Sequence, residues 1–141
     1  MTLRSMSACL VSGVMLLGAG SATAQEPSQR AAERLAQFEQ TGESRTCLSM
    51  SRISSIRPLD DSYFLVEVRG SGTWLTTMRG RCNQAASPFT YIQYSVPASQ
   101  LCRGDIVQVV DSSTQMFAGS CSFGDFERLI PLDIGDRAAS R

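Results

Sequence analysis

The sequence predicts a mainly β protein, namely a small antiparallel barrel or roll of about six strands with one short N-terminal helix, stapled by disulfides. First, apolar and polar residues alternate over several short segments, and residues typical of turns separate these segments. Second, four of the five cysteines follow an N-terminal segment of the kind that directs export, where disulfides form. Third, 141 residues allow one compact domain beyond that segment.

Residues 1–24 have the pattern of a secretory signal peptide. Arg4 carries the only charge, an apolar run covers residues 14–20, and small residues precede Gln25. The run is shorter than the about 20 apolar residues that span a bilayer. We expect cleavage before Gln25 and a periplasmic or secreted protein with no membrane span after cleavage. Lipidation is not expected, because Cys9 precedes most of the apolar run.

A short helix is expected over residues 28–40. Ala31, Leu35 and Phe38 recur at helical spacing, and Gly42 can end the helix. We expect Leu35 and Phe38 to dock the helix on the sheet. The expected organisation is a signal peptide (1–24), a short helix and linker (25–44), a β domain (45–132) and a flexible tail (133–141).

From Cys47 onward the apolar period changes to two, which is typical of strands. Alternation breaks between Met50 and Ile53, so the first strand is expected to contain a bulge. The next two strands complete a three-stranded meander, joined by a tight turn at residues 70–72. Apolar residues within 123–130 are expected to fold over the sheet. The expected strands cover residues 47–56, 63–69, 73–79, 89–96, 106–110 and 115–118.

Cys47, Cys82, Cys102 and Cys121 form an even set, which indicates two disulfides in an oxidising compartment. Three pairings are possible. Cys102 and Cys121 flank a candidate hairpin and are placed to meet at its base. Alternatively, and more in keeping with a meander, Cys47 pairs with Cys121 and Cys82 with Cys102. The sequence has no Cys-x-x-Cys spacing, which argues against a zinc site or a redox motif.

The composition argues against enzyme chemistry. The chain has no histidine and no lysine, so the commonest general base, metal ligand and Schiff-base residue are absent. We expect no enzyme, no cofactor and no metal. The 13 basic and 13 acidic residues balance, which argues against a nucleic-acid partner.

The arginines gather in the first two thirds of the β domain and suggest a binding face. The candidate residues for this face are Arg52, Arg69, Arg79 and Trp74. An anionic envelope component or an envelope protein would be its partner. Charges on neighbouring strands that neutralise one another are the structural alternative.

Other patterns have local explanations. The tripeptide at 103–105 spells an integrin-binding motif but is also a turn before a strand. The acidic residues at 60–61 and at 125 and 127 lack the spacing of a calcium loop, and 60–61 lies where a turn favours aspartate.

The chain resembles an uncharacterised family of small exported proteobacterial proteins that carry a domain of unknown function and four cysteines. The resemblance covers about residues 47–130. It depends on Cys47-Leu48-Ser49, Arg81-Cys82, Leu101-Cys102-x-Gly104-Asp105 and Gly119-Ser120-Cys121-x-Phe123-Gly124-x-Phe126. This resemblance implies a domain of the cell envelope. It implies no activity and no catalytic residue, because none is known for the family.

Together these observations predict a non-enzymatic binding module of the cell envelope. The alternative is a small periplasmic inhibitor of a hydrolase, which would present the loop at 83–88 to a catalytic cleft.

Overall fold

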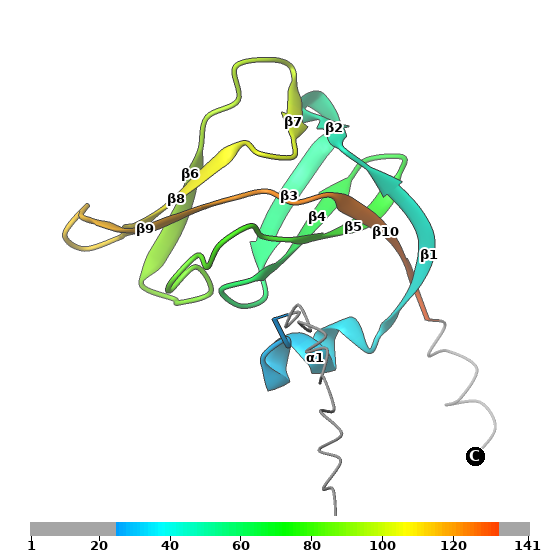
Figure 1. The fold of residues 1–141 in the computed structure, drawn as a ribbon, viewed down its shortest axis with the longest axis horizontal. Helices are drawn as coiled ribbons and strands as arrows, with labels where there is room; N and C mark the ends of the chain where they lie inside the picture. The colour runs from blue at the N-terminus through cyan, green and yellow to red at the C-terminus, as the bar shows by residue number, and fades with distance from the viewer. Residues whose placement is uncertain (1–24, 133–141) are drawn as a thin grey trace, which may run out of the picture.

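The computed structural model describes residues 25–132, so the expected signal peptide and the tail at 133–141 lie outside the described residues. Within this range the chain forms a short helix and ten strands (Figure 1). The elements are α1 (Gln29–Leu35), β1 (Phe38–Arg45), β2 (Cys47–Ser49), the 3-10 turn η1 (Met50–Arg52), β3 (Ile53–Pro58), β4 (Tyr63–Val68), β5 (Gly72–Thr77), β6 (Thr90–Tyr94), β7 (Gln100–Cys102), β8 (Ile106–Asp111), β9 (Phe117–Ser122) and β10 (Phe126–Pro131).

The helix α1 is shorter than the expected helix over 28–40. Ser28 caps its start, because the Ser28 hydroxyl accepts a hydrogen bond from the backbone N–H of Ala31 (3.3 Å). Leu35 is its last residue. Leu35 and Phe38 both pack against a buried cluster on one face of the largest sheet, but only Leu35 belongs to the helix, because Phe38 begins β1. This cluster consists of Leu65, Leu75 and Leu129.

Residues 38–45 form strand β1, so the expectation of a linker up to residue 44 was wrong. β1 pairs antiparallel with β10, and the register shifts between Gln40 and Ser44. Gly42 lies inside this bulge with a φ of 79°, a conformation that glycine adopts without steric cost. The segment is extended because β10 has β5 on one side only, and its other edge needs backbone partners.

The largest sheet has five antiparallel strands in the order β1-β10-β5-β4-β3. Its β3-β4-β5 part is the predicted meander. The segment expected to fold over the sheet is instead strand β10, inside the sheet. The sequence hides this strand because it buries one apolar residue on each face: Phe126 packs in the main core and Leu129 packs on the helix side, which breaks the alternation.

The remaining strands form a three-stranded sheet, β6-β8-β9, and a two-stranded sheet, β2-β7, both antiparallel. The mainly β, antiparallel class is therefore confirmed. The ladders of the described residues form three separate sheets, so the closed barrel or roll stays a prediction. Strand β9 runs over 117–122 rather than 115–118, because residues 112–116 form the hairpin turn.

The main core lies between the two larger sheets and centres on Phe123, which has no exposed surface. Its ring contacts Phe64 and Tyr94 edge-on, with 6.4 Å between centroids in each pair. Phe126 lies at a tilt 5.9 Å away. Residues from both sheets therefore meet on one aromatic side chain in the segment that connects β9 to β10.

The predicted pair of disulfides is confirmed, and the bonds follow the third possible pairing, so the preference for Cys47–Cys121 and Cys82–Cys102 was wrong. Cys47 bonds Cys102, and Cys82 bonds Cys121. Cys102 ends β7, which pairs with β2 and brings Cys102 directly opposite Cys47. Cys121 lies instead on β9 opposite Val107 of β8, and Cys82 reaches it from the segment after β5.

Candidate functional site

The expected arginine face does not form one surface. Arg52 and Arg69 lie side by side, since the backbone N–H of Arg69 donates to the carbonyl of Arg52 (2.8 Å). This pair lies where β4 turns into β5, whereas Arg79 follows the opposite end of β5 and bridges Ser122 of β9. At about 3.4 Å per residue, the two ends of a six-residue strand are about 17 Å apart. Arg79 therefore belongs to another part of the surface.

Trp74 lies in the core, so its assignment to a binding face was wrong. Its exposed fraction is 0%, and its indole N–H donates to the Ser71 hydroxyl (3.2 Å). The Arg45 guanidinium lies 5.0 Å from the ring centroid. Glu43 accepts hydrogen bonds from Arg128 (3.0 Å) and Arg45 (2.8 Å), which hold the pKa of this carboxyl below its usual value. The charged groups nearest the indole are thus engaged with one another.

The segment 102–105 is a structural turn. Gly104 has a φ of 94°, and one carboxylate oxygen of Asp105 accepts a hydrogen bond from the backbone N–H of Cys102 (2.7 Å). The turn docks on Phe123 through two backbone hydrogen bonds, from Gly104 N–H to the Phe123 carbonyl (2.9 Å) and from Phe123 N–H to the Asp105 carbonyl (3.0 Å). The Gly104-Asp105 and Phe123-Gly124 motifs of the family resemblance therefore contact each other. We call this contact between residues 102–105 and 123–124 the clasp.

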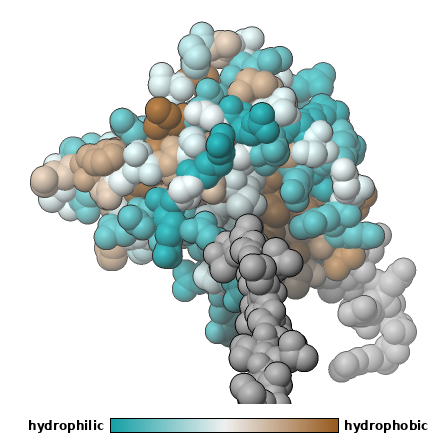
Figure 2. Space-filling view, in the orientation of Figure 1, coloured by the Kyte–Doolittle hydropathy of each residue, from teal (hydrophilic) through white to brown (hydrophobic). Residues whose placement is uncertain are grey.

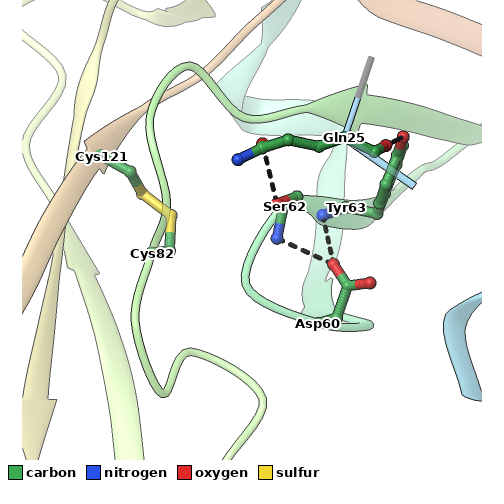
Figure 3. The surroundings of a disulfide bond; sticks show 6 residues. All are labelled: Gln25, Asp60, Ser62, Tyr63, Cys82 and Cys121. Carbon is green, nitrogen blue, oxygen red and sulfur yellow. Dashed lines mark hydrogen bonds between the residues drawn. A yellow bond between two sulfur atoms is a disulfide. The ribbon is translucent and has the colours of Figure 1, made fainter. Parts of the chain in front are cut away.

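Asp60 holds the start of the described chain against the sheet. Its carboxylate accepts hydrogen bonds of 2.8 Å from the backbone N–H groups of Ser28, Ser62 and Tyr63. Figure 3 shows Ser62 also reaching the side chain of Gln25 (3.0 Å) beside the Cys82–Cys121 disulfide. Burial opposes ionisation of Asp60, but the three hydrogen bonds outweigh it and lower its pKa.

Asp61 and Asp125 each face an arginine. Asp61 lies 3.9 Å from Arg81, and Asp125 lies 3.3 Å from Arg103. Across residues 25–132, no group of three Cys, Asp or Glu side chains is arranged to hold a metal ion. Three of the four acidic residues singled out in the sequence, Asp60, Asp61 and Asp125, thus have structural partners.

The loop at 83–88 is compact and tied down at both ends. Cys82 anchors its start through the disulfide, and the carbonyl of Cys82 accepts the N–H of Ala85 (2.9 Å). The Thr90 hydroxyl donates to the carbonyls of Gln84 (2.6 Å) and Ser87 (3.2 Å). Ala85 is buried, so the loop presents a fixed backbone shape.

An apolar tip lies next to this loop at the end of the three-stranded sheet. It consists of Phe89, Met116 and Phe117, which are 73%, 67% and 61% exposed. The carbonyl of Phe89 accepts the N–H of Ser112, which joins the loop to the β8–β9 hairpin. Figures 1 and 2 show this hairpin protruding from the molecule and coloured as partly hydrophobic at its end. The sequence analysis did not single out this tip.

A groove of about 830 Å³ lies along β6 and the start of β8. Gln93 and Gln108 stand directly opposite each other in the β6–β8 ladder. Ile106, at the first position of β8, is 60% exposed. The clasp supplies one end of the groove, since Asp105 both fixes the turn and lines the wall. The lining residues are Ile92, Gln93, Tyr94, Ser95, Gly104, Asp105, Ile106 and Gln108.

The lining of the groove combines hydrogen-bonding and apolar side chains. No other residue within 25–132 forms a hydrogen bond with the side chain of Gln93, Tyr94, Ser95 or Gln108. Ile92 and Ile106 supply the apolar surface. Such a lining can orient a polar, uncharged ligand by hydrogen bonds while apolar contact adds affinity.

Sequence reasoning identified the strands of this groove and considered an aromatic groove lined by Trp74 with Tyr63, Tyr91 and Tyr94, of which only Tyr94 lies here. The polar side chains on the exposed strand face gave no separate signal, because they also suit simple solvation. The hollow arises where β6, the turn at 102–105 and the start of β8 meet, and the Cys47–Cys102 disulfide links the start of this turn to β2.

No helix within residues 25–132 is long and apolar enough to cross a membrane. The two disulfides indicate a compartment outside the cytoplasm. No curated protein and no solved structure is detectably similar to the chain. A family model described as a family of unknown function (DUF6491) matches residues 2–131. The sequence resemblance to a family of unknown function is thereby confirmed. Since the match spans most of the chain, the protein belongs to this family of unknown function.

Proposed function

We propose that this protein is an exported, non-enzymatic binding module of the bacterial cell envelope, periplasmic or secreted, which binds an uncharged glycan segment in the β6–β8 groove. The observation that carries the proposal is the set of four polar side chains that line the groove without a partner among the described residues. They are Gln93, Tyr94, Ser95 and Gln108.

The chemistry of the lining favours a neutral ligand rich in hydroxyl groups. Carboxamides both donate and accept hydrogen bonds, as sugar hydroxyls do. Asp105 is the one ionisable carboxylate in the lining, and one of its oxygens already accepts the Cys102 N–H. The lining has too few charged groups to neutralise a strongly charged ligand.

The compartment supports an envelope ligand. Both disulfides are formed, and the sequence predicts a signal peptide. An exported module of this kind meets glycan strands and other envelope polymers. No cofactor and no nucleic acid enters this proposal.

Titration of the ¹⁵N-labelled protein with chito-oligosaccharides, which are uncharged envelope-type glycans, tests the proposal. We expect amide shift changes along β6, the turn at 102–105 and the start of β8. Losing one hydrogen bond of about 1 kcal/mol weakens binding about fivefold, so we expect that effect for Gln108→Ala. Gln40→Ala is the matched control, because Gln40 is an exposed glutamine on β1, outside the groove.

Two results would count against the glycan proposal. First, titration with a polyanion could shift the amides of Arg52 and Arg69. That result would favour the anionic envelope component predicted from the sequence as the ligand. Equal effects of Gln108→Ala and Gln40→Ala would remove the groove from the binding site.

The inhibitor hypothesis is a second candidate, and one observation favours it. The loop at 83–88 is held rigid and lies beside an apolar tip of exposed Phe and Met side chains, which are common in protein interfaces. Its test is inhibition of purified envelope hydrolases by the protein. The variant Phe117→Ser should abolish inhibition, and Gln108→Ala should leave it intact.

A further inference from the structure

The two disulfides differ in access to solvent. Cys82 has no exposed surface and Cys121 is 7% exposed. Cys47 and Cys102 are both half-buried. A thiolate must reach a sulfur atom in line with the S–S bond to exchange with it, so access favours reaction at Cys47–Cys102.

The two disulfides also differ in their backbone setting. Cys47 and Cys102 are direct partners across the antiparallel strands β2 and β7. Cys82 instead reaches Cys121 of β9 from the segment after β5.

The strands that carry Cys47 and Cys102 form a separate, minimal sheet. β2 and β7 have three residues each and pair only with one another among the described strands. Next to the disulfide, Leu48 and Leu101 are direct partners and are buried in the main core. We expect these buried side chains to keep the two strands paired after reduction, so that the bond can open without exposing the core.

We propose that Cys47–Cys102 is a site of thiol–disulfide exchange, at which a protein dithiol of the envelope reduces this chain. One thiolate of the donor attacks a sulfur of the pair and forms a mixed disulfide, and the released cysteine thiolate takes a proton from water. The second donor thiolate then attacks the donor sulfur of the mixed disulfide and releases the other cysteine. The donor ends as a disulfide, and two electrons have passed to Cys47 and Cys102. The chain is the substrate of this step, since it has no Cys-x-x-Cys motif of its own.

The exchange site touches the groove directly. The backbone N–H of Cys102 donates to the Asp105 carboxylate, and Asp105 lines the groove. The next residue, Arg103, donates its N–H to the carbonyl of Thr46 beside Cys47 (2.7 Å). Reduction therefore loosens the turn at 102–105 and with it one wall of the groove. This coupling to binding rests on the proposed function, whereas the exchange itself does not.

The test is graded reduction of the native protein by reduced thioredoxin, chosen as a protein dithiol. Samples are quenched with acid at intervals, alkylated, and mapped by peptide mass spectrometry. We expect Cys47 and Cys102 to become alkylated at least about tenfold faster than Cys82 and Cys121. Loss of both disulfides at the same rate, or of Cys82–Cys121 first, would overturn the proposal.

A double substitution provides the control for folding. The variant Cys47→Ser/Cys102→Ser imitates the open state, and we expect a cooperative melting transition with Cys82–Cys121 intact. An unfolded variant would show that the bond is required for the fold and would contradict a reversible exchange site. The alkylation experiment reads only the cysteines. Its result therefore tests the exchange site independently of glycan binding. The glycan titration is then repeated on the reduced wild type, and this second measurement tests the coupling between reduction and binding.

Discussion

Gly124 offers a sharp test of how the clasp joins the two larger sheets. It is buried, and a Cβ atom placed on it would overlap the carbonyl oxygen of Thr77 and lie 3.3 Å from its carbonyl carbon. Both atoms belong to the backbone at the end of β5, so no side-chain rotation relieves the contact. The substitution Gly124→Ala must therefore displace the link between β9 and β10 or the end of β5.

The expected cost follows from this contact. Overpacking of a core typically costs about 1 to 3 kcal/mol, and a clash with backbone belongs at the upper end, about 3 kcal/mol. An unfolding entropy of about 2.1 cal/mol/K per residue gives about 0.23 kcal/mol/K over residues 25–132. The Tm of Gly124→Ala should accordingly fall by about 13 °C, measured by circular dichroism on the oxidised protein.

Gly119→Ala is the matched control. It lies on β9, and a Cβ atom there would meet Asn83 at 3.8 Å or more, an ordinary van der Waals contact. Its Tm should stay within about 2 °C of wild type, since surface-type substitutions change stability by about 0.5 kcal/mol or less. A Gly124→Ala protein as stable as the control would refute the reasoning about the clasp.

Three further predictions concern the core and the β8–β9 turn. The hydroxyl of Ser113 and then the N–H groups of Thr114 and Ser113 hydrogen-bond the Asp111 carboxylate and lower its pKa to about 2. Because the folded pKa is below the unfolded one, Asp111 stabilises the protein above about pH 4, and this contribution disappears as pH falls through about 2. The Tm difference between wild type and Asp111→Asn should therefore shrink over that range; a constant difference would contradict it. Trp74, the only tryptophan, should emit in the blue, resist acrylamide quenching and shift to the red on unfolding; red emission from the native protein would place it at the surface. Phe123→Ala should lower the free energy of unfolding by about 3 to 5 kcal/mol in urea titrations, because it empties the centre of the aromatic cluster; a loss below about 1 kcal/mol would contradict that role.

The amino-acid pattern was sufficient where structure depends on neighbours in the chain. The meander of β3, β4 and β5 was predicted because period-two alternation and turn residues act within a few positions. The packing of Leu35 and Phe38 on the sheet was predicted for the same reason, although Phe38 belongs to β1 and only Leu35 docks the helix. The disulfide count followed from cysteine number and expected compartment.

Long-range pairing decided the rest. Strand β10 buries one apolar residue on each face, so it shows no alternation, and β1 pairs with the edge of β10 that β5 leaves open. The sequence of a single strand does not show which face of the strand is buried, so Trp74 fits either the core or the surface. In the folded protein Trp74 packs in the main core. The arginines lie on different ends of one sheet because antiparallel strands reverse direction at each turn.

The sequence by itself determined the antiparallel β class, the number of disulfides, the meander and the absence of histidine and lysine chemistry. Only the tertiary structure decided which cysteines meet, where β10 inserts and that a groove forms beside β6. The physical reason is that alternation and turn propensity are local properties of the chain. The partner of a cysteine or of a strand edge depends on contacts between residues far apart in sequence, such as Cys47 and Cys102, 55 positions apart.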